Sequence, residues 1–344
     1  MFKNLAILLC IICFFIHDLK AQDIHFTSYD FSPLTLNPAL VGGFSGSYRI
    51  GGIYRDQWRS AAVKGAYSTP TIHVDVPIIR GLRKQDWVGI GVGVFRDQSS
   101  QYRMVETKSF QGVSYHLSLD KKQNRILSFG IQNGTGNRRL NLREGRDLLT
   151  ETVILGQTAN NEIPTLDNQL ITQEGSNLTD WVGGVVFSSY QRNLSFIRAG
   201  FSVGRINRAN QAFAKGVDRQ KLKFTAFALY DTPIAGNLFL TPSLMYQRTG
   251  NNWETVAQVK TSYLLSEAKS MYINGGLGYR VGDAVQFLLG VDIKNTKVQL
   301  AYDLTASGYT AATNSVGAFE LAVSYVGKVY KKPKIDPTQV CPRL

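Results

Sequence analysis

The sequence predicts a transmembrane, antiparallel, up-and-down β-barrel of about fourteen strands. A secretory signal opens the chain, and stretches that alternate apolar with polar residues follow it. The run 270–293 shows the alternation best, with Met271 and Ile273 on one parity and Asn274 and Gly276 on the other. Because successive side chains of a strand point to opposite faces, each stretch has one apolar and one polar face. No later stretch is apolar for about 20 residues, the length that a membrane-spanning helix needs.

Residues 1–21 read as a secretory signal peptide. Lys3 supplies the positive charge, residues 5–16 form the apolar core, and Ala21 is the small residue at the cleavage site. The mature chain would begin at Gln22, with two lysines and one aspartate removed and a net charge of +12. Its Lys and Arg residues are scattered rather than striped, which favours membrane-surface or acidic-partner electrostatics over nucleic acid.

Alternation and turn residues together place fourteen strands in the mature chain. They fall near residues 47–57, 67–77, 87–97, 108–119, 125–136, 181–190, 196–205, 222–231, 237–247, 254–264, 270–281, 284–293, 296–304 and 317–326. An even number of strands returns both ends of the barrel to the same side of the membrane. We therefore expect residues 47–326 to form the barrel.

The connections between these strands are alternately short and long. Short, turn-like connections lie at 120–124, 191–193, 233–236 and 294–295, and long polar ones at 137–180, 206–221 and 305–316. The tight Gly282-Asp283 is an exception among the second group. Bacterial barrels keep short turns in the periplasm and long loops outside, so we expect an outer-membrane protein with both termini in the periplasm.

The parity of each strand assigns its faces. In 87–95 the apolar residues Val88, Ile90, Val92 and Val94 should face lipid, and the glycines between them should line the lumen. The charged residues and histidines of the inward parity are Arg49, Arg55, His73, Asp75, His116, Arg198, Lys260, Arg280, Asp292, Lys297, Asp303 and Glu320. We expect a lumen of mixed charge with a basic excess, in which Arg49, Arg55, Arg198, Lys260, Arg280 and Lys297 line the wall and contact a guest.

The residues that enzymes and metal sites need are not arranged for chemistry. Only Cys341 survives signal removal, which excludes an internal disulfide framework and a multi-cysteine metal site. Ser202 sits in a G-x-S-x-G string, but the segment alternates as a strand and every histidine precedes it. The sequence therefore predicts no catalytic, cofactor-binding or metal site, and a protein that is not an enzyme.

Three segments exceed what a barrel needs. The leader 22–46 is aromatic and apolar, with Pro33 and Pro38 against regular structure, and fits either a plug or a strip that docks a periplasmic protein through Asn37 and Pro38. The loop 137–180 carries four arginines and seven acids and suits a lid, a plug or a partner site. The tail 327–344 is basic. Either it is solvated, or it docks to a periplasmic assembly through Lys331, Lys332, Lys334 and Cys341.

Short motifs in these segments and in the first strand resemble one family. They are QDIHF at 22–26, LNPA at 36–39 followed by Gly42, YRDQW at 54–58 and CPR at 341–343. In this order they resemble the PorP/SprF family of the type IX secretion system of Bacteroidota. The likeness in layout covers the whole mature chain, and that in motifs covers roughly residues 22–60 and the last few residues.

The resemblance implies a non-enzymatic outer-membrane barrel for secretion or surface attachment. Its cargo would be a secreted protein or a gliding adhesin with a C-terminal sorting domain. Its other partners would be a periplasmic peptidoglycan-binding lipoprotein or the secretion ring proteins, besides outer-membrane lipid, and no nucleic acid. The alternatives are a passive porin for small solutes and a purely structural anchor with a plugged lumen.

Overall fold

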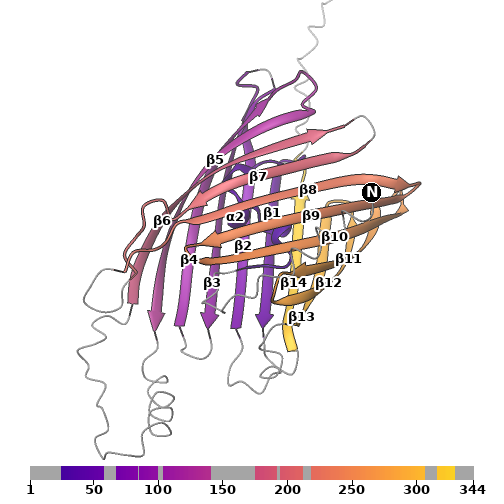
Figure 1. The fold of residues 1–344 in the computed structure, drawn as a ribbon. Helices are drawn as coiled ribbons and strands as arrows, with labels where there is room; N and C mark the ends of the chain where they lie inside the picture. Colours follow the sequence, from indigo (N-terminus) through magenta and orange to yellow (C-terminus); the bar gives the residue numbers. More distant parts are fainter. Residues whose placement is uncertain are drawn as a thin grey trace, which may run out of the picture.

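The computed structural model describes residues 25–57, 67–83, 85–99, 104–140, 175–191, 194–211, 218–306 and 316–329. In this part of the chain, fourteen antiparallel strands follow one another around a closed barrel, and the last pairs with the first (Figure 1). The predicted fold class is confirmed. The strands are β1 (Tyr48–Gln57), β2 (Tyr67–Arg80), β3 (Trp87–Ser99), β4 (Met104–Ser118), β5 (Arg125–Leu140), β6 (Gly175–Tyr190), β7 (Phe196–Gly204), β8 (Lys223–Ala235), β9 (Leu238–Thr249), β10 (Asn252–Ser266), β11 (Met271–Arg280), β12 (Ala284–Ile293), β13 (Thr296–Thr305) and β14 (Val316–Gly327).

Two of the predicted connections are shorter in the structure, because strands extend into them. β5 continues to Leu140, and β6 begins at Gly175, so both ends of the predicted loop 137–180 belong to strands. Polar residues pair there as Asn137 with Asn177. β8 runs through Pro233 to Ala235, and the turn that follows begins at Gly236, whose φ of +50° suits a glycine.

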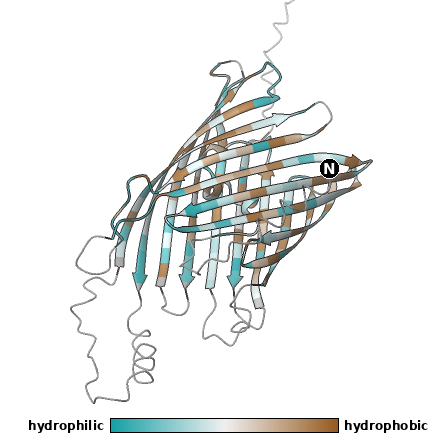
Figure 2. Ribbon diagram, viewed as in Figure 1, coloured by the Kyte–Doolittle hydropathy of each residue, from teal (hydrophilic) through white to brown (hydrophobic). Residues whose placement is uncertain are grey.

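The two faces of the wall follow the predicted parity. Val92 and Ile72 are 55% and 54% exposed on the outside, whereas His73 and Asp75, which have the opposite parity to Ile72 in β2, are each 1% exposed. Figure 2 shows hydrophilic and hydrophobic colours alternating along the strands. The apolar parity therefore faces outward, toward the lipid of a membrane.

The leader lies inside the barrel. It forms three short helical turns, η1 (Tyr29–Phe31), α2 (Pro33–Leu36) and η2 (Pro38–Leu40), and Figure 1 shows α2 within the ring of strands. None of the helices among the described residues has the length and apolar character needed to cross a membrane.

We name the end of the barrel that holds the start of β1 and the end of β14 the near end, and the opposite end the far end. Tyr48 and Gly327 pair at the near end. His25 lies 3.8 Å from Glu254, close to the start of β10 and thus toward the far end. The leader therefore runs back through the lumen and enters β1 at the near end.

Candidate functional site: the leader-filled lumen

The first anchor of the leader is a buried polar cluster toward the far end. The backbone N–H groups of Thr27 and Ser28 donate to the two carboxylate oxygens of Glu320, at 2.7 and 2.8 Å. The Thr27 hydroxyl donates to Asp303 at 2.7 Å, and Gln258 donates to the Thr27 carbonyl at 2.9 Å. Both leader residues are fully buried. The wall thus supplies the partners that these buried backbone groups need.

The acids of this cluster are neutralised by two buried arginines. Arg55 pairs with Glu320 and, at 3.1 Å, with Asp303. Arg280 lies 3.0 Å from Asp303 and 3.2 Å from Glu254. Removing one partner would leave a buried charge without compensation, so the network is stable only when all its members are present.

The second anchor is the turn at Asn37. Its side-chain amide donates to the carbonyls of Val185 and Phe201, at 3.2 and 3.0 Å, which face each other across β6 and β7. Its side-chain oxygen accepts from the Ala39 N–H at 2.9 Å and so caps η2.

Two glycines make room for this turn in the wall. Gly130 of β5 and Gly184 of β6 are cross-strand partners. A Cβ at Gly184 would collide with the Asn37 side chain, and one at Gly130 with the backbone of Ala39. The turn packs directly on the bare backbone of the sheet.

The third anchor holds residues 40–42 toward the near end. Asp75 accepts from the Gly42 N–H at 2.7 Å and pairs with Arg49 at 2.6 Å. The Val41 carbonyl accepts from the Ser114 hydroxyl at 2.5 Å and from His116 Nε2 at 2.7 Å. A carbonyl only accepts, so this contact assigns the proton of the His116 ring to Nε2.

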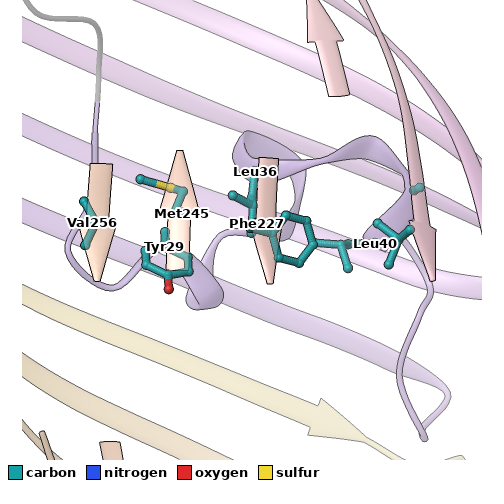
Figure 3. Packing of buried hydrophobic residues seen from close by; sticks show 8 residues of the cluster. Tyr29, Leu36, Leu40, Phe227, Met245 and Val256 are labelled. Carbon is teal, nitrogen blue, oxygen red and sulfur yellow. The ribbon is translucent and has the colours of Figure 1, made fainter. Parts of the chain in front are cut away.

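Apolar side chains of the leader fill the space between these anchors. Figure 3 shows Tyr29 and Leu36 beside Met245 and Phe227 of the wall. Tyr29 also donates to the Ser243 hydroxyl at 2.8 Å, and burial raises the pKa of its phenol above the usual 10. Each fully buried side chain of this kind contributes about 1.5–3 kcal/mol.

A cavity lies on each side of the leader. The near-end cavity has a volume of about 420 Å³ and lies between the leader and β2–β7. The far-end cavity, of about 110 Å³, lies between the leader and the far end and is lined in part by Lys108, Asp180 and Lys223. The leader thus separates two vestibules of the lumen.

The six predicted lumen cations lie on the inward parity, but most are already paired. Arg49, Arg55 and Arg280 bind wall acids, as described above. Lys260 pairs with Asp30 of the leader at 2.5 Å, and Lys297 lies at the rim, 3.3 Å from Asp292. Arg198 differs, since none of the described residues offers it a carboxylate. Arg49, Arg55, Arg280 and Lys260 thus hold the leader and the wall together.

The structure also places Asn37 and Pro38, the two leader residues that are predicted to dock a periplasmic partner. Both side chains are buried in the lumen against β5 and β6, so a partner outside the barrel does not reach them in this structure. Several predicted features lie outside the described residues: the signal peptide, most of the loop 137–180, Lys331, Lys332, Lys334 and Cys341.

Ser202 faces the lumen, where its hydroxyl donates to the Leu36 carbonyl at 3.3 Å. No cluster of potential metal ligands occurs among the described residues.

The polar anchors of the leader, Thr27 and Ser28, were not predicted from the sequence. One signal could have pointed to their partners. Arg55 faces Glu320 across β1 and β14, and Arg49 faces Asp75 across β1 and β2. Inward ion pairs at matched register mark where the wall holds charge, although they do not show that the leader binds there.

Comparisons with known proteins agree with the fold. Residues 18–325 match the family described as type IX secretion system membrane protein PorP/SprF. Among solved structures, the CymD monoaromatic hydrocarbon channel is 10% identical with a TM-score of 0.50, covering 88% of this chain and 94% of that chain. The P. putida toluene transporter TodX is 10% identical (TM-score 0.48, 86% and 93% covered), and the KdgM porin is 9% identical (0.37, 80% and 98%). At 10% identity, the likeness to CymD shows the barrel fold alone. No curated protein matches the chain.

A closed barrel with an apolar outer face is the architecture of outer-membrane proteins. The chain is accordingly an outer-membrane barrel, and its fold is not that of an enzyme.

Proposed function

The chain belongs to the PorP/SprF family of type IX secretion system membrane proteins, and on that premise we propose that it binds a secreted cargo protein or adhesin and helps to export or anchor it at the cell surface. The cargo would engage through a C-terminal sorting domain. Periplasmic partners, either a peptidoglycan-binding lipoprotein or the secretion ring proteins, would engage at the other side of the membrane.

The observation that carries this proposal is the occupied lumen. A fourteen-stranded barrel is wider than the eight-stranded kind that side chains alone fill. Here the chain's own leader fills that space. Glu320, the Val185 carbonyl and Asp75 of the wall bind it. A barrel whose lumen is filled by a segment of its own chain is suited to presenting fixed surfaces at its two ends.

The two ends have different surfaces. Short turns connect strands at the near end, whereas the strand pairs β1–β2, β5–β6 and β13–β14, which follow one another at the far end, are separated in sequence by nine residues or more. We assign the near end to the periplasm and the far end to the cell surface, following the usual arrangement of bacterial barrels. Cargo would then meet the far end and periplasmic partners the near end.

The rival function is a passive channel for small solutes. It requires a continuous aqueous path, and the leader crosses the lumen from the far half to the near end. That placement weighs against the rival without depending on the family.

The test is affinity purification of the full mature chain from its native outer membrane in mild detergent. We expect a large surface protein to co-purify at near-equal amounts and to be lost when its C-terminal sorting domain is deleted. Recovery of the barrel alone, with steady ion conductance in a planar bilayer, would contradict the proposal and favour the channel.

A further inference from the structure

The near-end cavity is lined by positive charges that no acid among its described lining residues balances. Arg80, Lys122 and Arg198 line it, and no aspartate or glutamate is among its lining residues. Elsewhere in the lumen the inward arginines meet carboxylates, as Arg55 meets Glu320. The near-end cavity is therefore cationic and has no acid of its own among the described residues that line it.

Arg198 is the best placed of these cations. Its Nε donates to the Ser188 hydroxyl at 3.2 Å, and its guanidinium lies 4.8 Å from the centre of the Phe196 ring. These contacts fix the plane of the guanidinium. Among the described residues, its two terminal nitrogens have no hydrogen-bond acceptor. A planar, fixed guanidinium with free N–H groups is suited to binding a carboxylate with two hydrogen bonds.

The remaining walls are suited to a peptide rather than to a small ion. Leu40 and Val186 are apolar lining residues from the leader and the wall, and Trp87 and Tyr190 add aromatic rings. The volume of about 420 Å³ lies within the range of ligand sites of roughly 300–1,000 Å³. A simple anion would use the cations and leave these surfaces without contact.

We infer that the near-end cavity binds an acidic peptide segment of a partner protein, with Arg198 as the main carboxylate-binding residue. Lys122 and Tyr190, which line the cavity, are exposed, so the cavity opens at the near end. The net charge of +12 on the mature chain favours the approach of acidic partners. The inference rests on the proposed function for the existence of a partner at this end of the barrel.

The test uses the full mature chain in detergent micelles and two fluorescein-labelled peptides of equal length, one rich in glutamate and one rich in glutamine. Fluorescence anisotropy should show that the glutamate peptide binds at least tenfold more tightly than the glutamine peptide. Arg198→Gln should weaken its binding at least tenfold. Arg248→Gln, which removes an exposed cation at the far end, should leave it unchanged.

Three results would overturn the inference: no preference for the glutamate peptide, equal effects of the two substitutions, or displacement of the peptide by inorganic phosphate at equimolar concentration. The cargo experiment separates this inference from the proposed function. Intact cargo capture with no peptide binding would reject only the cavity, and peptide binding without cargo capture would reject only the cargo function.

Discussion

At the scale of single residues, the buried acids hold the leader in place. Glu320 is completely buried and binds two leader N–H groups as well as Arg55. Asp303 and Arg280 extend the same network. Removing any one charge leaves the others without compensation.

We predict that Glu320→Gln lowers the free energy of unfolding by about 3–5 kcal/mol, since it leaves Arg55 short of a partner and places an amide against N–H donors. The measurement is denaturant unfolding of the barrel in lipid vesicles. Glu267→Gln, in an exposed turn after β10, is the control and should change it by less than about 0.5 kcal/mol. Equal effects of the two substitutions would show that the network does not stabilise the fold.

Gly42 is required for two separate reasons. Its φ is +66°, and a Cβ there would lie 2.7 Å from the Gly89 Cα. Gly282 has a similar φ of +74° but open space around it. We predict that Gly282→Ala costs only the conformational penalty of about 1–2 kcal/mol. Gly42→Ala should cost about 1–3 kcal/mol more, because the leader and β3 must separate. Thermal unfolding of both variants checks this, and equal costs would refute the close contact.

Residue parity was predictable from the sequence, whereas the partners of the inward residues were not. Alternation alone places Asp75 and Glu320 inside. Their contacts with Gly42 and with Thr27 join positions far apart in the chain, the second pair 293 residues apart, and local patterns carry no information on such distances.

At the scale of elements, strands were predictable wherever they cross the membrane. β3 and β12 alternate along most of their length, since one face meets lipid and the other the lumen. The ends of β5 and β6 were not predicted, because strand residues that extend beyond the apolar band can be polar on both faces. The helical turns of the leader were not predicted either, because they are too short to show a helical period.

The lipid face makes a prediction for β3. Val92 lies in the middle of the strand and is 55% exposed. Val92→Lys should destabilise the barrel by about 2–4 kcal/mol in lipid vesicles, the cost of a cation near the bilayer midplane. Leu119→Lys, at an equally exposed position just after β4, should cost about 0–1 kcal/mol because it lies near the interface. The reverse order would contradict the membrane placement of β3.

At the scale of the whole molecule, the barrel was predictable and its contents were not. Fourteen alternating segments with short and long connections lead to a closed barrel. The apolar, proline-containing leader was compatible with either a plug or an external strip. Glycines of the wall such as Gly130 and Gly184 mark the places where the leader packs.

The central claim is that the leader fills the lumen and makes the barrel a platform rather than an open pore. The most direct test compares the ion conductance of the full mature chain in planar bilayers with that of a variant lacking residues 25–42, both confirmed as folded by heat-modifiable gel mobility. We predict little or no steady conductance for the full chain and large, stable openings for the variant. Equally large, steady conductance from both would contradict the claim.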